Sequence, residues 1–260
     1  MQRTGSAKYI RPLTTKAALD HARSLHQKKF REVSGDFLVQ GERSVRELLG
    51  SGWPVQALFA TEEMARVLKL TDANIVLPHE LDRISTLESG SQLVAVVRKP
   101  HRAPLERLEA DELVIALDGI RDPGNFGTVL RIADWFGVRR VLCSADCVEE
   151  FNPKCVQASM GAFLRVDVHR HDLAPKLQAL RSAGATLYLA SMEGASVFTT
   201  SLRSPAILVL GSEAHGVSKA IRDLKSELIS VPRSGGAESL NVAMAASALC
   251  MEFTRQRLAR

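Results

Sequence analysis

The chain has 260 residues, of which 45% are hydrophobic and 24% charged, and its formal net charge is +5. This length is enough for two domains with cores of their own, and no apolar run approaches the roughly 20 residues that span a bilayer. Residues 1–8 lack the apolar stretch of a secretory signal, so we expect a cytoplasmic protein that is not bound to a membrane.

The positive charge is concentrated near the start of the chain. Residues 1–32 contain eight Lys or Arg and two acidic residues, whereas the remainder is nearly neutral. Such a segment indicates binding to a polyanion through phosphate neutralisation, although a solvated basic helix explains the charge equally well. Aromatic residues make up only 5% of the chain, which argues against a platform that stacks single-stranded bases.

The four cysteines do not have the spacing of a metal site. Cys143 and Cys147 form one short pair, but no second pair follows at a distance typical of zinc ligands. We therefore expect reduced thiols and no bound metal.

A small α/β domain is predicted over residues 16–98, after a basic tail over residues 1–15. A basic helix over 16–31 opens this domain, and alternating strand and helix signals follow it. The expected strands are 37–40, 55–59, 74–77 and 92–97, and the expected helices are 42–49, ended by Gly50 or Gly52, then 62–69 and 79–86.

Residues 99–112 contain two prolines and several charges, and we predict that they link the first domain to a second one. This second α/β domain is expected over residues 113–260. Its apolar runs at 113–117, 206–210 and 228–231 are predicted strands, and a long helix over about 239–257 closes it.

Each of these three apolar runs leads into a loop of glycine, proline and small polar residues. The loops cover residues 122–127, 211–216 and 232–241. In open α/β sheets, ligands bind beyond the carboxyl ends of strands, where glycine lets the backbone approach and helix N-termini offer unpaired N–H groups. The placement of the loops therefore predicts one ligand crevice.

The first and third loops carry more polar residues than turns and helix caps require. Thr128 could cap the helix after the first loop, with Arg131 in its first or second turn, where it could reach a phosphate or lie in solvent. In the third loop Ser239 or Asn241 could cap the last helix. Capping does not account for Glu238, Ser239 and Asn241 together, which suggests a ligand.

The second loop excludes two common nucleotide sites. It has glycines at 211 and 216 but no Lys-Ser or Lys-Thr pair after them, so it is not a triphosphate-binding loop. No strand leads into G-x-G-x-x-G, which disfavours a nucleotide-dependent oxidoreductase. Glu213 is either a residue at a helix N-terminus, favoured there by the helix dipole, or part of the predicted ligand site.

The three loops together strongly resemble the ordered motifs of the SpoU (TrmH-type) RNA 2′-O-ribose methyltransferases. The matching stretches are Asp122-Pro-Gly-Asn-Phe-Gly-Thr-Val-Leu-Arg131, Leu210-Gly-Ser-Glu-Ala-His-Gly-Val-Ser218 and Val231-Pro-Arg-Ser-Gly-Gly-Ala-Glu-Ser-Leu-Asn-Val-Ala243. Residues 152–161 are also similar to a segment of that family, and the first half is similar to its upstream L30e-like substrate-binding domain.

The resemblance implies a trefoil-knotted α/β methyltransferase domain that binds S-adenosylmethionine, forms a homodimer and methylates structured RNA. By the motifs, Gly211, Val231 and Leu240 would hold the cofactor, with Ala243 nearby. The catalytic residues implied in the same way are Asn125, Arg131, Glu213, Ser239 and Asn241. Three positions depart from the family's common pattern: Ser212, Gln157 and Arg233. These differences affect the expected choice of RNA and the expected cofactor contacts, and the expected reaction is the same.

The resemblance favours 23S ribosomal RNA as the substrate. A tRNA methyltransferase and a non-catalytic RNA-binding or ribosome-assembly factor are the alternatives. Because a guanidinium with a pKa above about 12 is a poor base, we expect Arg131 to engage the target phosphate and stabilise developing alkoxide charge. Proton abstraction by Arg131 is the stronger version of this hypothesis.

Overall fold

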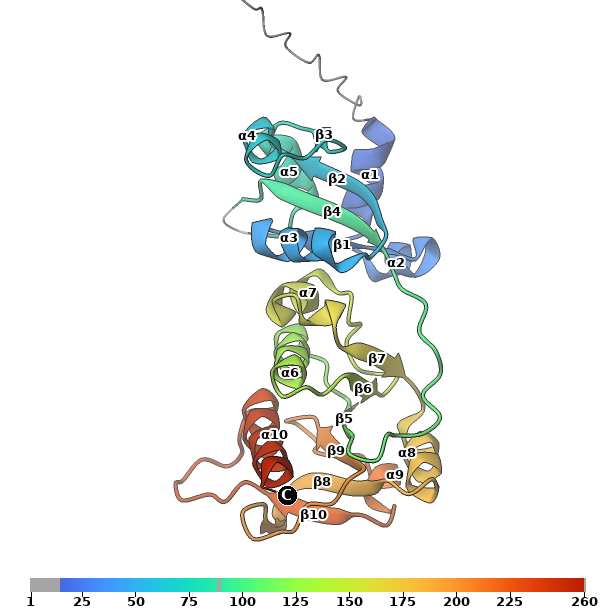
Figure 1. Cartoon of the computed structure of the whole chain (residues 1–260), viewed down its shortest axis with the longest axis vertical. Helices are drawn as coiled ribbons and strands as arrows, with labels where there is room; N and C mark the ends of the chain where they lie inside the picture. Colours follow the sequence, from blue (N-terminus) through green and yellow to red (C-terminus); the bar gives the residue numbers. More distant parts are fainter. Residues whose placement is uncertain (1–14, 88–89, 260) are drawn as a thin grey trace, which may run out of the picture. The chain divides into compact units, whose positions relative to one another are not determined.

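The structure is a computed structural model and describes residues 15–87 and 90–259 (Figure 1). The chain divides into two compact units, residues 1–100 and 101–260. Of the expected basic tail, only Thr15 belongs to the described residues, where it is the N-cap of the first helix. Within the described ranges, no helix has the length and hydrophobicity to cross a membrane.

The first unit is built on a four-stranded sheet in the order β1-β4-β2-β3. β4 pairs antiparallel with β1 and β2, while β2 pairs parallel with β3. The strands are β1 Asp36–Gln40, β2 Val55–Ala60, β3 Asn74–Ile75 and β4 Leu93–Arg98, and the helices are α1 Lys16–Ser24, α2 Lys28–Ser34, α3 Glu42–Ser51, α4 Glu62–Val67 and α5 Pro78–Ile84. β4 is apolar almost throughout because it lies in the interior of the sheet and is buried.

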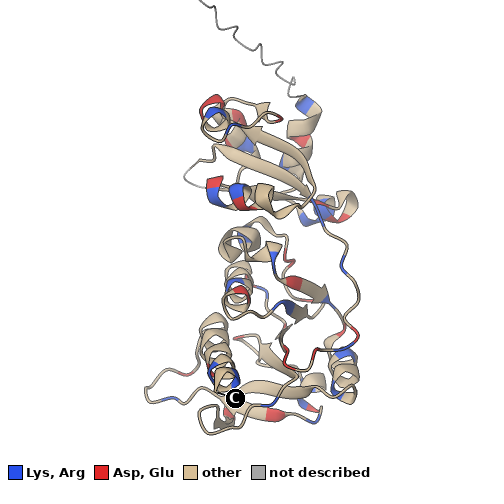
Figure 2. Ribbon diagram, in the orientation of Figure 1, with Lys and Arg blue, Asp and Glu red and all other residues tan. Residues whose placement is uncertain are grey.

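The single basic helix expected over residues 16–31 is wrong, because the chain breaks it into α1 and α2. The Arg31 guanidinium, 2% exposed, donates hydrogen bonds from Nη1 to the carbonyls of Leu25 (2.7 Å) and His26 (2.9 Å) at this break. One member of the basic segment is therefore a structural residue. Other basic side chains of α1 and α2 remain exposed (Figure 2).

The second unit contains a six-stranded parallel sheet in the order β10-β8-β9-β5-β6-β7. Its strands are β5 Leu113–Asp118, β6 Arg140–Cys143, β7 Asp167–Arg170, β8 Thr186–Ser196, β9 Ala206–Gly211 and β10 Glu227–Ser230. Its helices are α6 Pro123–Trp135, α7 Pro153–Ser159, α8 Leu173–Ser182, α9 Lys219–Arg222 and α10 Val242–Leu258. Because all six strands run in one direction, their carboxyl ends lie along one edge.

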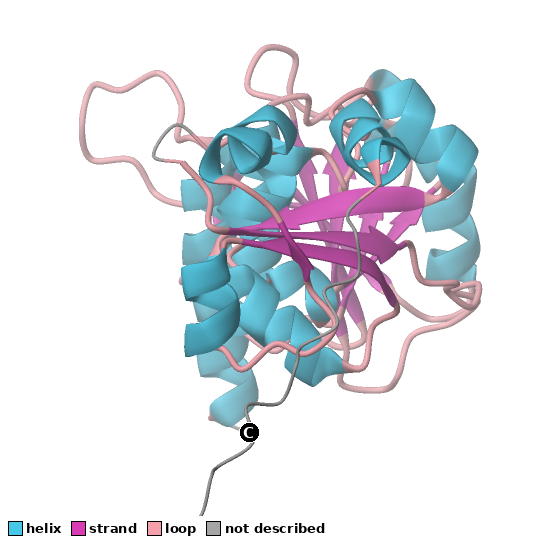
Figure 3. Ribbon diagram, turned by 90° about the horizontal axis from the view of Figure 1, so that it is seen from above, coloured by secondary structure: helices cyan, strands magenta, loops and turns pink. Residues whose placement is uncertain are grey.

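Helices flank the strands (Figure 3), and in the second unit alternate side chains of each strand enter different cores. Ile115 and Leu117 of β5 pack in the core that includes α6 and α10, whereas Val114 and Ala116 pack with α8 and α9. Both faces of the sheet are covered, which explains why its strands read as continuous apolar runs rather than as alternating ones.

The expected linker packs largely on the second unit. Leu105 is 1% exposed in the core beside α8, and its carbonyl accepts a hydrogen bond from Lys176 Nζ. Glu112 is buried and forms an ion pair with Arg140 at the start of β6. Residues 101–112 thus have no helix or strand but are anchored by specific contacts.

Gly127 marks the closest approach of α6 to α7. A Cβ atom at this position would lie 2.5 Å from the carbonyl oxygen of Cys155 and 2.7 Å from Cβ of Ala158. Although alanine favours a helix over glycine by about 1 kcal/mol, Gly127→Ala is expected to destabilise the protein by about 1–3 kcal/mol through overpacking. The control Gly50→Ala in α3 has no atom within 4 Å of the new Cβ, so it should stabilise slightly in urea unfolding.

Glu252 is a buried, ionised carboxylate of α10 that orients Gln256, which in turn contacts the chain outside the helix. Hydrogen bonds from Arg255 and Gln256 hold the pKa of Glu252 at about 2, and Gln256 also accepts from the backbone N–H of Leu202 (3.0 Å). A folded pKa below the unfolded value of roughly 4.3 stabilises the fold above that pH, and the contribution is lost as pH falls toward 2. In thermal melts, the difference in Tm between the wild type and Glu252→Gln should therefore shrink between pH 6 and pH 2.5; a constant difference would contradict this.

Candidate active site

The three loops predicted to form a crevice follow β5, β9 and β10 at the carboxyl edge of the parallel sheet. β5 and β9 are direct neighbours, with Asp118 paired to Gly211 at their ends, so the first two loops begin side by side. The third loop runs from β10 into α10, which packs against α6. This topology brings segments about 30 to 120 residues apart into one place.

Side chains from all three loops form one hydrogen-bonded group, the Asn125–Glu213–Asn241 junction. Glu213 Oε1 accepts from Asn241 Nδ2 at 2.7 Å and from Asn125 Nδ2 at 3.2 Å. Asn241 Nδ2 also donates to Asn125 Oδ1 at 3.0 Å. Three of the five candidate catalytic residues are thus in direct contact.

Asn241 joins the junction while it caps the last helix. Its Oδ1 accepts from the backbone N–H groups of Ala243 (3.0 Å) and Met244 (3.3 Å), and Val242 N donates to Glu213 Oε1 at 3.3 Å. The helix therefore begins at Val242, three residues later than expected. Ser239 is exposed in the preceding loop and lies outside this network.

The helix after the first loop begins earlier than expected. Asp122 is its N-cap, accepting from Asn125 N at 2.7 Å, and Thr128 instead donates to the Gly124 carbonyl at 2.7 Å. Arg131 consequently lies in the third turn of α6 rather than in the first or second. It is exposed, and it is not among the residues that line the cavity described below.

The second loop is a tight hairpin rather than a helix start. Ser212 N donates to the Gly216 carbonyl at 3.2 Å, and Gly216 N donates to the Ser212 carbonyl at 2.8 Å. A Cβ on Gly211 would lie 2.1 Å from Gly216 C, so only glycine fits there. After β9 the next helix begins only at Lys219, so the alternative that Glu213 is a helix N-terminal residue is wrong. Ser212, a departure from the family pattern, caps the turn by accepting from His215 N at 3.2 Å.

The remaining candidate cofactor residues lie at the two ends of the third loop. Val231 follows β10 and packs against the core cluster that contains Ala243, which is 1% exposed. Leu240 has a side chain that is 47% exposed in an otherwise polar loop. An exposed apolar side chain and free loop backbone suit a ligand with both an apolar and a polar part.

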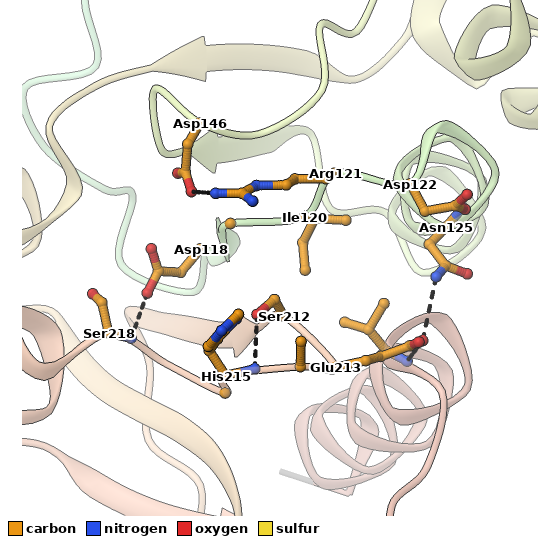
Figure 4. A pocket seen from close by; sticks show the side chains of 14 residues that line it. Asp118, Ile120, Arg121, Asp122, Asn125, Asp146, Ser212, Glu213, His215 and Ser218 are labelled. Carbon is orange, nitrogen blue, oxygen red and sulfur yellow. Dashed lines mark hydrogen bonds and ion pairs between the residues drawn. The ribbon is translucent and has the colours of Figure 1, made fainter.

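A cavity of about 490 Å³ opens beside the junction, between the loops after β5, β6 and β9 (Figure 4). Asn125, Glu213 and Val242 line it together with residues that the sequence analysis did not single out: Asp118, Arg121, Asp146, His215 and Ser218. A signal for Asp146 was present, because the short apolar run 141–143 belongs to a further strand of the same sheet, β6. Within residues 15–87 and 90–259, no three His, Cys, Asp or Glu side chains are placed to hold a metal ion.

Comparison with known proteins agrees with this geometry. Residues 112–251 match the model of the SpoU rRNA Methylase family, and residues 18–96 match the MRM3-like substrate binding domain. The chain is 30% identical over 247 residues to a 23S rRNA (uridine(2479)-2′-O)-methyltransferase of Streptomyces viridochromogenes, covering 88% of this chain and 85% of the relative. It is 29% identical over 232 residues to the 23S rRNA (guanosine(2553)-2′-O)-methyltransferase RlmP of Bacillus subtilis, covering 87% and 92%.

Among solved structures, the chain is similar to the SpoU methyltransferase AviRb from Streptomyces viridochromogenes in complex with AdoMet. The TM-score is 0.84 at 29% identity, and the match covers 94% of this chain and 99% of AviRb. The two family models together thus match most of both units. The chain belongs to the SpoU rRNA methylase family and is an RNA 2′-O-methyltransferase.

Proposed function

We propose that the protein transfers the methyl group of S-adenosylmethionine to the 2′-hydroxyl of one ribose in 23S rRNA. The Asn125–Glu213–Asn241 junction carries this proposal, because it joins the three loops that the family motifs occupy. The 23S rRNA methyltransferases among its relatives support ribosomal RNA rather than tRNA as the substrate. Those two relatives modify different bases, so the target nucleotide is a separate question.

Gly211, Val231, Leu240 and Ala243 are proposed to hold the cofactor. The AviRb complex supports this type of ligand, and the exposed Leu240 beside the buried start of α10 supplies an apolar contact for it. When bound, S-adenosylmethionine supplies an electrophilic methyl group on a sulfonium. The trefoil knot that the family resemblance implies stays a prediction.

The residues of this chain must align the ribose and stabilise charge on its oxygen. We assign alignment to Asn125 and Asn241, whose amides are fixed by Glu213 and therefore need not reorganise during the reaction. Arg131 would bind the phosphate next to the target ribose and stabilise the developing alkoxide. Ser239 lies in the exposed loop before Asn241, where it could contact the RNA or the cofactor.

The experiment combines purified protein, radiolabelled S-adenosylmethionine and unmodified 23S rRNA transcripts, with 16S rRNA and tRNA as controls. Label is expected on one 23S nucleotide, at a site resistant to alkaline hydrolysis because its 2′-oxygen is blocked. Label on tRNA alone would favour the tRNA alternative. Absence of both labelling and S-adenosylmethionine binding would favour the non-catalytic factor.

A homodimer and a cytoplasmic location, where ribosomal RNA resides, belong to the same proposal. Exposed apolar side chains on the two packed helices α6 and α10 support the dimer: Trp135 is 84% exposed, Met244 56% and Met251 55%. Apolar surface of this kind favours association with a second copy. Arg131 lies one turn before Trp135, so this interface would also border the reaction site.

Trp135→Glu is expected to convert the dimer into a monomer, because a carboxylate would lose its solvation in an apolar interface. Light scattering measures the mass directly. Val67→Glu, on a comparably exposed apolar residue of the first unit, is the matched control and should leave the mass unchanged. A wild-type protein that is monomeric at micromolar concentration would contradict the proposal.

A further inference from the structure

The cavity beside the junction is not lined by the residues proposed to hold the cofactor, which are Gly211, Val231, Leu240 and Ala243. Its volume of about 490 Å³ lies within the roughly 300–1,000 Å³ of small-ligand sites. Because junction residues form part of its wall, a group bound there lies next to the reaction centre.

The charged side chains in the cavity wall are predominantly acidic. It contains the carboxylates of Asp118, Asp122, Asp146 and Glu213, against the guanidinium of Arg121 (Figure 4). Carboxylates repel phosphate and accept hydrogen bonds from N–H groups. An RNA would therefore keep its backbone outside this cavity and could place only a base inside it.

Asp118 is a buried carboxylate with spare hydrogen-bonding capacity. The residue is 8% exposed, and its Oδ2 accepts from Ser218 N at 2.7 Å. No donor within the described residues bonds its Oδ1, and the residue lines the cavity. A carboxylate oxygen that lines the cavity and has no donor from the described protein can accept a hydrogen bond from a ligand there.

Asp146, which lies close to Gly119 and so to Asp118, is held in a fixed position in the cavity wall. Ser144 Oγ donates to Asp146 Oδ1 at 2.6 Å and accepts from Gly119 N at 2.9 Å. Arg170 donates to four carbonyl oxygens of residues 144–148, at 2.8 to 3.1 Å, and so fixes the loop. The hydrogen bond from Ser144 lowers the pKa of Asp146, so this carboxylate is ionised and preorganised as an acceptor.

Resting on the proposed function, we propose that this cavity binds the base of the nucleotide to be methylated and that this base is guanine. Guanine alone presents three N–H hydrogens on its Watson–Crick edge, on N1 and the N2 amino group, which can pair with a carboxylate. Uracil presents one N–H between two carbonyls, and adenine and cytosine place a ring acceptor next to their amino group. Arg121 can donate to the guanine O6 acceptor.

The first test maps the base at the methylated nucleotide of 23S rRNA. A guanosine is expected, and methylation of any other base would overturn the inference while leaving the proposed function intact. Absence of methylation would instead contradict the proposed function. In a second arm, GMP should inhibit methyl transfer at a concentration at least tenfold lower than UMP does, and equal inhibition would also overturn the inference.

Variants test the carboxylates themselves. Asp146 Oδ2 accepts from Arg121 Nη2 at 3.4 Å, on two exposed side chains, so the base would share this carboxylate with Arg121. Asp146→Asn retains an oxygen for Ser144 but replaces Oδ2 by an amide nitrogen, so kcat/KM for RNA should fall at least tenfold, chiefly through KM, with S-adenosylmethionine binding unchanged. Asp118→Asn is the second variant, with the same expectation. Asp223→Asn, an exposed carboxylate paired with Lys219, is the matched control and should behave as wild type. Wild-type KM in both cavity variants would overturn the role of these carboxylates.

Discussion

Arg131→Ala is expected to lower the rate of methyl transfer by about 10²–10³-fold or more, the effect typical of removing a group that stabilises transition-state charge. The ribose oxygen becomes more anionic as its proton leaves, and a guanidinium that bridges the adjacent phosphate and this oxygen stabilises the change. Single-turnover assays with saturating RNA measure the rate of the chemical step.

Binding of S-adenosylmethionine should be nearly unchanged in the same variant, because Arg131 lies in the third turn of α6 and outside the three loops. Calorimetry tests this. Arg131→Lys should recover only part of the rate, since an ammonium cannot form the bidentate contact. Arg139→Ala, an exposed arginine just after the same helix, is the control. Wild-type turnover in Arg131→Ala would remove Arg131 from the mechanism.

Glu213→Ala is expected to lower kcat/KM by at least about 10²-fold through loss of alignment, although Glu213 need not touch the reacting atoms. Its Oε1 accepts three N–H donors, from Asn125, Asn241 and Val242. Without this acceptor the Asn241–Asn125 hydrogen bond still joins the third and first loops, but the second loop loses its side-chain contacts with both, so the alignment of the two amides weakens.

Glu213→Gln separates geometry from charge. Its amide oxygen can still accept from the two asparagines, so a positioning role predicts activity between those of the wild type and Glu213→Ala. Glu193→Ala, an exposed glutamate of β8, is the control. If Glu213→Gln were as inactive as Glu213→Ala while its loops stayed ordered, the charge rather than the geometry of Glu213 would be essential.

The sequence predicted three of the six strands of the second unit, β5, β9 and β10, and the loops that follow them, because these features are local. It did not predict β6, β7 and β8. Continuous apolar runs such as 113–117 and 206–210 reflect burial on both faces of a parallel sheet, and glycine at position 211 reflects a turn that admits no Cβ. Residues on loops after parallel strands were therefore expected to meet, and Asn125, Glu213 and Asn241 do meet.

Helix boundaries depend on hydrogen bonds that several residues can make, and the tertiary structure decided them. Asp122 rather than Thr128 caps α6, which moves Arg131 to the third turn. Likewise the carbonyls of Leu25 and His26 gain the buried Arg31 as a donor, so two helices replace one. Local propensity does not distinguish these arrangements, because it contains no information on which of several nearby donors and acceptors pair in the folded chain.

By itself, the sequence thus determined the class of fold, the family motifs and the edge of the sheet at which chemistry occurs, because each follows from local patterns of apolar, glycine and polar residues. Only the tertiary structure decided which side chains form hydrogen bonds with one another. It also placed a cavity with acidic side chains beside them. Asp118 and Asp146 lie in that cavity because β5 and β6 are adjacent strands, and Arg170 of β7 fixes the loop that follows β6. Contacts between strands are long-range properties, which no single stretch of residues encodes.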